Sequence, residues 1–379
     1  MLQELVLSNF KTLQADVRLP LGPRLTLLLG ANNTGKSNAL AALRLLGQTA
    51  RLQSLDRAVQ SLGGAASLVT RGQARCHVRA HGVVEGQKFD QHLTFASSDV
   101  LPGGESFEEV KVGDLVLSPA SPANQVRLSN GSMPVVGAGR VLAAEASPPT
   151  PAAGAVNLQQ LLRSIQVFDL SVARLRQPAA YQEGLALGTD GSGLAAMLDF
   201  LSGTAPDLFE AIQDDVRRGA PEVLRLTTPP APGNPQFKVV GVQERDRRVY
   251  LASELSDGLL LFIGLSTAAA LGGDPSAPKG PRLLAIEEPE RGIHPRRIRS
   301  VIDYLRRLAD HETQVVISSH SPLVLDEFAE TPEDVLLFDR GPAGTSIKRL
   351  TEVAGWEALV GGAPLGDVWY SGVLGGVPR

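Results

Sequence analysis

Two adjacent glutamates, Glu287 and Glu288, follow a wholly apolar run at residues 283–286. Ionised carboxylates are rarely buried without a partner, so this pair requires a counter-ion or a chemical task. The segment GANNTGKS, residues 30–37, can supply the counter-ion and the task. It fits the pattern G-x-x-x-x-G-K-[ST] of a phosphate-binding loop and lies between an apolar run and a helical pattern. In such a loop the backbone N–H groups and the helix N-terminus bind phosphate oxygens. The two segments together predict a site for a nucleotide and Mg²⁺.

Each polar residue of these segments has a role in the predicted site. Lys36 reaches the β- and γ-phosphates, while the Ser37 hydroxyl and Glu287 hold Mg²⁺, Glu287 directly or through water. Glu288 orients and polarises the water that attacks the γ-phosphate. Mg²⁺ takes few protein carboxylates and keeps several waters, which suits one glutamate for the metal and one for the water. The alternatives are an ordinary glycine-rich turn and two surface glutamates. The predicted nucleotide-binding residues of the loop are Gly30, Ala31, Asn32, Asn33, Thr34, Gly35, Lys36, Ser37 and Asn38.

Two further segments contain residues that can bind phosphate. SELSDG, residues 253–258, opens an apolar helical pattern, so Ser256 and Gly258 can form an anion site at the helix N-terminus. The alternative is that Ser256 is a plain N-cap of a core helix. VVISSHSP, residues 315–322, ends a predicted strand at His320. This histidine can hydrogen-bond the γ-phosphate and sense its hydrolysis, or it can be structural.

These segments must be positioned by strands and helices. Strands alternate with helices in the C-terminal part, which indicates a mostly parallel sheet. The predicted fold class is α/β, with a mostly parallel core sheet, an antiparallel β-rich lobe and a helical insertion. The predicted domains are an N-terminal lobe over 1–157, the helical insertion over 158–235 and a C-terminal lobe over 236–379. The clearest predicted strands lie at 2–8, 25–29, 75–84, 87–95, 283–287, 314–318 and 335–338, and the clearest helices at 37–46, 259–271 and 295–309.

The composition is that of an ordinary soluble protein. Its 379 residues are 43% hydrophobic and carry a formal net charge of −4, so any contact with nucleic acid must come from a local patch. The single cysteine, Cys76, excludes a disulfide framework and a cysteine-based zinc site. The N-terminus lacks a signal-peptide pattern, and no apolar stretch is long enough to span a bilayer. We therefore expect a cytoplasmic protein that has no membrane contact.

Taken in order, the four segments resemble the motifs of ABC-type ATPase heads and, within them, the OLD/RecF/SMC-like AAA-family ATPases. They look like a Walker A motif, an LSDG signature, a Walker B motif of the form EEPE-x-x-x-HP and an SSHSP switch motif. SNFKTL at 8–13 and GTDGSGLAAML at 188–198 also resemble segments of these proteins. The resemblance implies an ABC-type P-loop head that hydrolyses ATP to ADP and phosphate with Mg²⁺. Too few residues follow His320 for the Toprim nuclease domain often carried by OLD-type proteins.

The resemblance also implies an ATP-dependent homodimer, in which two heads bury two ATP molecules between them. Each signature then acts on the nucleotide held by the other subunit. The site residues implied are, by role, the catalytic Glu288, His320 and Lys36, the trans-acting Ser256 and Gly258, and Lys11 at the phosphates.

Two departures from the usual pattern of these ATPases affect the metal site. Glu287 stands where most ABC ATPases carry Asp, which leaves open whether it touches the metal directly. The loop glutamine that normally contacts Mg²⁺ has only Gln166 and Gln177 as candidates.

Three functions fit these motifs. The first is an ATP-driven switch in DNA repair or anti-phage defence that binds double-stranded DNA or controls a separately encoded effector such as a nuclease. The second is a nucleotide-gated scaffold with slow turnover that regulates a protein partner. The third, the ATPase subunit of a membrane transporter, is disfavoured by the signature. The tail at 365–378, which contains Trp369 and Tyr370, docks a partner or packs on the core. The candidate DNA-binding arginines, whose alternative is a solvated helix face, are Arg296, Arg297, Arg299, Arg306 and Arg307.

Overall fold

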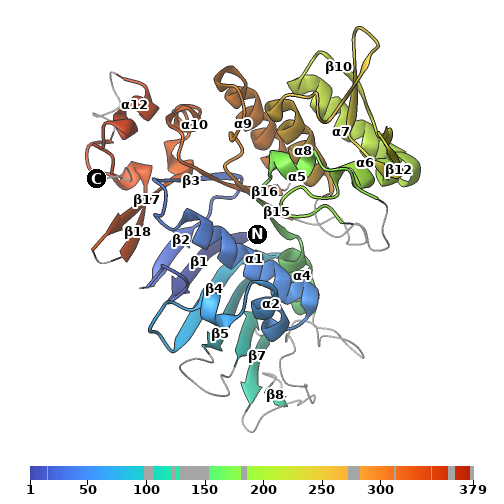
Figure 1. The fold of residues 1–379 in the computed structure, drawn as a ribbon. Coiled ribbons are helices and arrows are strands. Elements are labelled where there is room, and N and C mark those ends of the chain that lie inside the picture. The colour runs from blue at the N-terminus through green and yellow to red at the C-terminus, as the bar shows by residue number, and fades with distance from the viewer. Residues whose placement is uncertain are drawn as a thin grey trace.

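A six-stranded sheet with strand order β18-β17-β3-β16-β15-β9 forms the centre of the computed structural model (Figure 1). All its neighbouring strands are parallel except β17 and β18, which form an antiparallel hairpin at one edge. The mostly parallel core sheet predicted from the sequence is therefore confirmed. Its strands are β3 (Leu25–Leu29), β9 (Ile165–Phe168), β15 (Arg282–Glu287), β16 (Thr313–Ser319), β17 (Val335–Gly341) and β18 (Gly344–Arg349). The structure describes residues 1–14, 16–97, 106–113, 115–120, 125–127, 153–180, 186–271, 282–310, 313–342, 344–356 and 363–375.

A second sheet of seven antiparallel strands, in the order β2-β1-β4-β5-β6-β7-β8, is the predicted β-rich lobe. Buried and more exposed side chains alternate along β4, which is typical of a sheet with one face on the core. Most of the stretch at 143–155, which is rich in Ala and Pro, lies outside the described residues. The strands are β1 (Leu2–Ser8), β2 (Val17–Pro20), β4 (Arg75–Val84), β5 (Gln87–Ala96), β6 (Phe107–Val112), β7 (Leu115–Ala120) and β8 (Gln125–Arg127).

Helix α1 (Lys36–Leu52) joins the two sheets through one hydrophobic core. Its residue Leu43 shares this core with Val78 of the antiparallel sheet and with Ala285 and Val316 of the parallel sheet. Apolar residues on several faces of α1 are buried, because the helix lies between the two sheets (Figure 1). The short helices α2 (Leu55–Ser61), α3 (Ala65–Leu68) and the helix α4 (Ala153–Arg163) follow on this side.

A second hydrophobic core lies on the other face of the parallel sheet, under the remaining helices. Its centre is α8 (Asp257–Leu271), which is apolar on all sides and almost wholly buried, as expected for a helix surrounded by other elements. The amphipathic α9 (Pro295–Ala309) packs its buried residues against this core. The other helices here are α5 (Val172–Leu175), α6 (Leu194–Thr204), α7 (Pro206–Gly219), α10 (Pro322–Asp326) and α12 (Leu365–Tyr370), with the 3₁₀ turns η2 (Pro332–Asp334) and η3 (Leu350–Glu352).

Two small sheets complete the helical side, β10-β13-β14 and β11-β12. The division of the chain at residues 157 and 235 remains a prediction. Among the described residues, no helix combines the length and the apolar character needed to cross a bilayer. The strands of the small sheets are β10 (Val223–Thr227), β11 (Pro230–Ala231), β12 (Asn234–Lys238), β13 (Gly241–Glu244) and β14 (Val249–Leu251).

The C-terminal tail divides its two aromatic residues between the core and the surface. Trp369 is 3% exposed and belongs to the second core, whereas Tyr370 is 77% exposed. The Asp326 carboxylate accepts a hydrogen bond of 2.7 Å from the Gly366 backbone N–H and so ties α12 to α10. Of the two alternatives for this tail, packing on the core therefore applies to Trp369.

Two histidines face each other on the outer side of the antiparallel sheet. His77 Nδ1 lies 3.2 Å from His92 Nε2 and 3.0 Å from the Thr94 hydroxyl. Burial, and then the nearby Arg79 charge, lower the pKa of His92 to about 4. The ring is therefore neutral in the folded protein near neutral pH.

This shifted pKa predicts acid sensitivity. Since the folded-state pKa lies below the roughly 6.5 of a free histidine, the unfolded chain binds a proton that the folded chain excludes. Stability is therefore lost as the pH falls from about 6.5 toward 4. We expect His92→Gln to show a smaller drop in melting temperature than the wild type between about pH 7 and about pH 4.5. Thr94→Val, which removes a neighbouring hydroxyl but no titrating group, should keep the wild-type slope. Equal slopes for His92→Gln and the wild type would contradict the assignment.

Candidate active site

The predicted phosphate loop runs from the end of β3 to the start of α1. A Cβ atom on Gly30 would lie 2.5 Å from the Phe338 carbonyl oxygen, so only glycine fits there. Gly35 has φ 109° and caps α1, a backbone conformation that favours glycine. The Thr34 hydroxyl donates to the Ala31 carbonyl at 2.9 Å across the loop. The sequence thus folds locally into a tight turn whose last residues open a helix, as the pattern predicts.

Lys36 closes this loop from the inside. Its side chain is 6% exposed, and its ammonium donates to the carbonyl oxygens of Gly30 at 2.6 Å and Ala31 at 2.7 Å. Burial lowers the pKa of Lys36, while the nearby carboxylates of Glu288 and Glu287 oppose that shift. The ammonium is thus held at the centre of the loop, where a phosphate oxygen would compete with two carbonyl oxygens for it.

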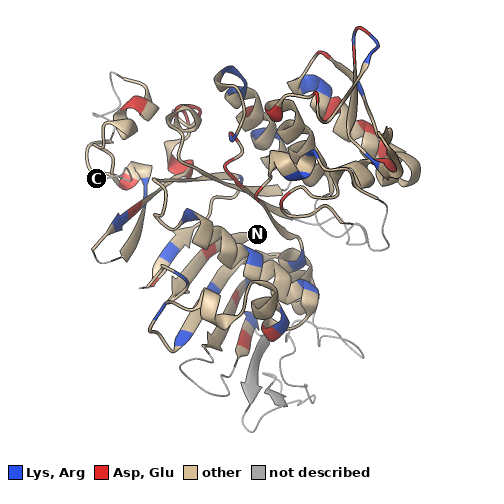
Figure 2. Ribbon diagram, in the orientation of Figure 1, with Lys and Arg blue, Asp and Glu red and all other residues tan. Residues whose placement is uncertain are grey.

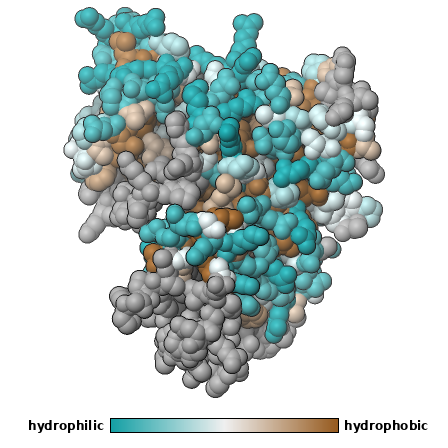
Figure 3. Space-filling model, turned by 180° about the vertical axis from the view of Figure 1, so that it is seen from behind, coloured by the Kyte–Doolittle hydropathy of each residue, from teal (hydrophilic) through white to brown (hydrophobic). Residues whose placement is uncertain are grey.

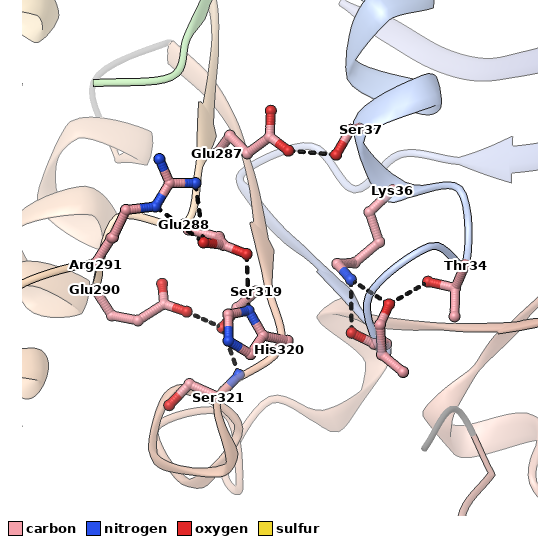
Figure 4. A network of polar contacts seen from close by, with 12 residues as sticks. Thr34, Lys36, Ser37, Glu287, Glu288, Glu290, Arg291, Ser319, His320 and Ser321 are labelled. Carbon is pink, nitrogen blue, oxygen red and sulfur yellow. Dashed lines mark hydrogen bonds and ion pairs between the residues drawn. The ribbon is translucent and has the colours of Figure 1, made fainter. Parts of the chain in front are cut away.

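Ser37 and Glu287 meet between α1 and β15. The Ser37 hydroxyl donates to Glu287 Oε1, although the two residues are 250 positions apart in the chain (Figure 4). A hydroxyl and a carboxylate are the hard oxygen ligands that Mg²⁺ takes from proteins. Within the described ranges no group of three His, Cys, Asp or Glu residues could hold a metal ion. One carboxylate and one hydroxyl nevertheless fit Mg²⁺ when phosphate oxygens and waters supply the remaining ligands.

Glu288 and His320 form a second pair beside the loop. Glu288 Oε1 lies 2.7 Å from His320 Nδ1, and the Glu288 side chain is 19% exposed. Glu288 has φ 47°, which turns its carboxylate out of the strand direction, and its N–H donates to the Ser318 carbonyl at 2.9 Å. Burial by itself would raise the pKa of Glu288, but contacts with Arg291 and His320 outweigh it and lower that pKa. The carboxylate is thus kept ionised next to a ring that can donate or accept a proton.

Ser319 and Glu290 support the strand end that carries His320. The Ser319 hydroxyl is hydrogen-bonded to Glu290 Oε1 and accepts from the Ser321 N–H at 2.9 Å (Figure 4). Burial raises the pKa of Glu290. This network fixes the backbone on both sides of His320.

Arg291 and Asp169 join the site without having been predicted. Arg291 donates to Glu288 Oε2 at 3.0 and 2.9 Å and to Asp169 Oδ1 at 2.8 Å. The sequence carried a signal for the first contact only, since Arg291 lies three positions after Glu288. Asp169 is 122 positions away and follows β9, the strand beside β15 in the sheet.

The hairpin of β17 and β18 holds the phosphate loop from the other side and was also missed. Arg340 donates to the Asn33 carbonyl at 3.1 Å, and the Thr345 hydroxyl donates to the Thr34 carbonyl at 2.8 Å. β18 was not predicted, and nothing in the local sequence of the hairpin points to the loop at residues 30–35. Two loop carbonyls are therefore satisfied by residues more than 300 positions away.

The remaining predicted residues lie beside this centre or away from it. Asn38 donates to the Thr12 hydroxyl at 2.6 Å and so anchors the turn that contains Lys11, whose φ is 53°. Neither Gln166 nor Gln177 is joined to Ser37 by a hydrogen bond in the part of the chain that the structure describes. Gln166 lies within β9, and Gln177 accepts from Arg174 at 3.4 Å.

The signature residues lie at the N-terminus of α8. The Ser256 hydroxyl accepts from the Leu259 N–H at 3.3 Å, which is the N-cap arrangement. Arg176 braces this turn by donating to the Leu255 carbonyl at 2.8 Å and to the Asp257 carboxylate at 2.7 Å. Among the described residues, no hydrogen bond joins Ser256 or Gly258 to the phosphate loop. Within one chain the structure thus brings Lys36, Ser37, Glu287, Glu288 and His320 together, but not the signature.

Comparisons with known proteins agree with this architecture. A family model described as "AAA domain, putative AbiEii toxin, Type IV TA system" matches residues 164–326. This span includes the signature, the two glutamates and His320, but not the phosphate loop. The comparison with curated proteins gave no match.

Two solved structures share the fold at low sequence identity. One is an Smc head bound to the C-winged helix domain of ScpA, with 12% identity, a TM-score of 0.57 and coverage of 92% of this chain and 97% of that chain. The other is an Smc head with an extended coiled coil from Pyrococcus furiosus, bound to the C-terminal domain of ScpA, with 12% identity, a TM-score of 0.54 and coverage of 92% and 95%. The chain therefore shares the fold of these Smc heads, which is the kind of fold that the motifs predicted.

Lys36→Ala tests the phosphate loop. A charged hydrogen-bond donor is worth about 1.5–3 kcal/mol, so we expect the dissociation constant of a slowly hydrolysed Mg-ATP analogue to rise roughly ten- to a hundredfold. Isothermal titration calorimetry measures this constant. Lys348→Ala, at an exposed position of β18, is the matched control and should bind as the wild type does. Unchanged binding by Lys36→Ala would show that the nucleotide does not use this loop.

Proposed function

We propose that this chain is an ATP-hydrolysing ABC-type head that dimerises around Mg-ATP and acts as a molecular switch. The observation that carries the proposal is the meeting of two pairs, Ser37 with Glu287 and Glu288 with His320, beside the buried Lys36 (Figure 4). The first pair suits a metal ion and the second suits proton handling at a water molecule. An ordinary glycine-rich turn with two surface glutamates would not require either pair.

The chemistry follows from these positions. The loop N–H groups and Lys36 bind the phosphates, and Lys36 exchanges its contacts with Gly30 and Ala31 for phosphate oxygens. Ser37 and Glu287 would hold Mg²⁺, which supplies charge neutralisation at the β- and γ-phosphates. Glu288 accepts a hydrogen bond from the attacking water and polarises it. His320, which lies on the Glu288 carboxylate, contacts the γ-phosphate and reports whether it is still attached.

The position of the signature supports a shared site. Ser256 and Gly258 lie at the start of a 15-residue helix, where backbone N–H groups and the helix dipole favour an anion. Since they make no hydrogen bond to their own phosphate loop among the described residues, a second copy is the economical source of the nucleotide they cap. We propose that each subunit of a homodimer completes the site of the other.

The biological role we favour is DNA repair or anti-phage defence. The family description names a putative toxin of a type IV toxin–antitoxin system, which is consistent with a defence role. The two solved structures are heads bound to domains of another protein, which is consistent with a protein partner. For this chain, we propose that the protein partner is a separately encoded effector such as a nuclease. A nucleotide-gated scaffold with slow turnover is the alternative.

The arginines of α9 offer limited support for DNA binding at this helix. Arg297 pairs with Glu222 at 2.8 Å, and Arg306 donates to the Glu327 carbonyl and lies 5.2 Å from the centre of the Phe328 ring. Such contacts occupy charges that phosphates would need. Basic and acidic residues are also interspersed along the visible ribbon rather than gathered by sign (Figure 2). Charge reversal at Arg296 and Arg297 that changes neither DNA affinity nor its salt dependence would remove this patch from the proposal.

A transporter subunit gains no support from the visible surface. The face seen in Figure 3 is mostly hydrophilic, with hydrophobic residues in scattered groups among the described atoms. Scattered apolar surface residues are normal for a protein that contacts water.

Glu288→Gln tests the catalytic carboxylate. The substitution keeps the shape of the side chain but weakens its ability to polarise water, so we expect hydrolysis to slow by about 10²- to 10⁴-fold while ATP still binds. The slowed enzyme should accumulate as an ATP-bound dimer, visible by size-exclusion chromatography with Mg-ATP. Glu330→Gln, at an exposed position, is the control. A Glu288→Gln protein that stays monomeric with saturating Mg-ATP would contradict the sandwich dimer.

Steady-state hydrolysis at increasing enzyme concentration tests the shared site directly. Specific activity that rises with concentration is expected if two copies complete each site. Stimulation by linear double-stranded DNA would favour the repair or defence switch over the scaffold. A rate that is independent of both concentration and DNA, from a protein shown to be monomeric, would contradict the dimer and the DNA partner.

A further inference from the structure

Among the described residues, Arg291 is the one Lys or Arg side chain hydrogen-bonded to the Glu288 carboxylate, which the His320 ring also contacts. It donates from Nε and Nη2 to Glu288 Oε2 at 3.0 and 2.9 Å, and from Nη1 to Asp169 Oδ1 at 2.8 Å. One guanidinium therefore bridges two carboxylates that follow neighbouring strands of the parallel sheet. The Walker B pattern assigns no residue type to its position, so the motif does not account for it.

The direction of approach separates Arg291 from the phosphate side of the site. In Figure 4 the Glu288 carboxylate lies between Arg291 and Lys36, so the guanidinium stands behind the carboxylate as seen from the phosphate loop. His320 Nδ1 contacts the other carboxylate oxygen at 2.7 Å. Both carboxylate oxygens of Glu288 are thus held in direction, one by Arg291 and the other by His320.

Glu288 needs such support because its backbone conformation does not by itself fix the direction of the carboxylate. Its φ of 47° is uncommon for a residue with a side chain, and conformations of this kind persist where surrounding contacts enforce them. The turn after Glu288 is closed by the Arg291 N–H, which donates to the Glu288 carbonyl at 3.0 Å. The same turn that reverses the chain therefore brings the guanidinium onto the carboxylate.

Asp169 is itself fixed by the segment GTDGSG at 188–193. The Asp169 N–H donates to the Thr189 carbonyl at 2.9 Å, and the Ser171 N–H donates to the Asp190 carbonyl at 3.0 Å. The Asp190 carboxylate accepts from the Ser192 N–H at 3.0 Å and so closes the segment on itself. The segment at 188–193 thus fixes the backbone of Asp169, whose carboxylate in turn binds Arg291.

We propose that Arg291 is a positioning residue that fixes the direction of the Glu288 carboxylate, with Asp169 as its support; the inference rests on the proposed ATPase function. The planar fork of arginine serves two carboxylates at once, whereas a lysine is a point charge. The ion pairs of Arg291 with Glu288 and with Asp169 differ in strength. Glu288 is 19% exposed, but Asp169 and Arg291 are 46% and 47% exposed, so the Asp169 pair is the weaker of the two.

The experiment compares kcat and the affinity for ATP in Arg291→Ala, Arg291→Lys and Asp169→Asn. Misdirecting a reacting group by about 1 Å costs on the order of a hundredfold in rate, so we expect Arg291→Ala to lower kcat by about ten- to a hundredfold. The dissociation constant of Mg-ATP should change less than about twofold, because Arg291 does not face the phosphate loop. Arg291→Lys should recover part of kcat. Asp169→Asn should lower kcat less than Arg291→Ala does. The double variant Arg291→Ala/Asp169→Asn should hydrolyse ATP no more slowly than Arg291→Ala alone.

Arg217→Ala is the matched control. Arg217 also bridges two carboxylates, those of Glu210 at 2.7 Å and Asp214 at 2.8 Å, but on α7. It should keep the wild-type kcat. Melting temperatures of all variants show whether any loss of activity comes from unfolding, and Arg291→Lys serves if Arg291→Ala fails to fold.

The outcomes separate the inference from the function on which it rests. A wild type that does not hydrolyse ATP would overturn both. If the wild type hydrolyses ATP and Glu288→Gln does not, the proposed function stands. Arg291→Ala with wild-type kcat, or with kcat and ATP affinity lost in parallel, would then overturn the inference alone. Additive losses in Arg291→Ala and Asp169→Asn would remove Asp169 from it.

Discussion

The parallel pairing of β16 between β3 and β15 is the constraint on which the rest of the site depends. Parallel strands end at the same edge of a sheet, so the phosphate loop, the two glutamates and His320 emerge side by side. The register of the strands brings their ends to the same level of the sheet, because Ser319 pairs with Leu29 and Ser318 pairs with Glu287. The apolar strands are buried on both faces by the two cores, and this burial keeps the edge in place.

The sequence predicted the parts of the site that are continuous in the chain. The strands at 2–8, 25–29 and 75–84 and the helix at 295–309 have the predicted bounds, because hydrophobic periodicity is a local property. Contacts between distant segments could not be predicted in this way. The bridge from Arg291 to Asp169 and the contacts of the β17–β18 hairpin with the phosphate loop depend on which strands become neighbours, and local sequence patterns do not reveal that pairing.

Charge is handled differently at the two halves of the site. Among the described residues, no carboxylate is hydrogen-bonded to the buried Lys36, which donates instead to two carbonyl oxygens that a phosphate can replace. Glu288 is instead bound to a guanidinium and an imidazole, which oppose the effect of burial on its pKa. The cation is therefore left available to an anionic ligand, while the anion is held in one ionisation state and one direction. This division suits the proposed function, in which the site exchanges a nucleotide but keeps its catalytic group in place.

The central sheet also has a consequence for biosynthesis. β3 lies near the start of the chain, but its partners β16 and β17 begin at Thr313 and Val335. While a ribosome is still translating the middle of the chain, β3 has neither neighbour, and the Asn33 and Thr34 carbonyls lack the hairpin that binds them. Contacts of such long sequence separation form slowly and late. The phosphate loop is thus among the first segments made and among the last to be completed.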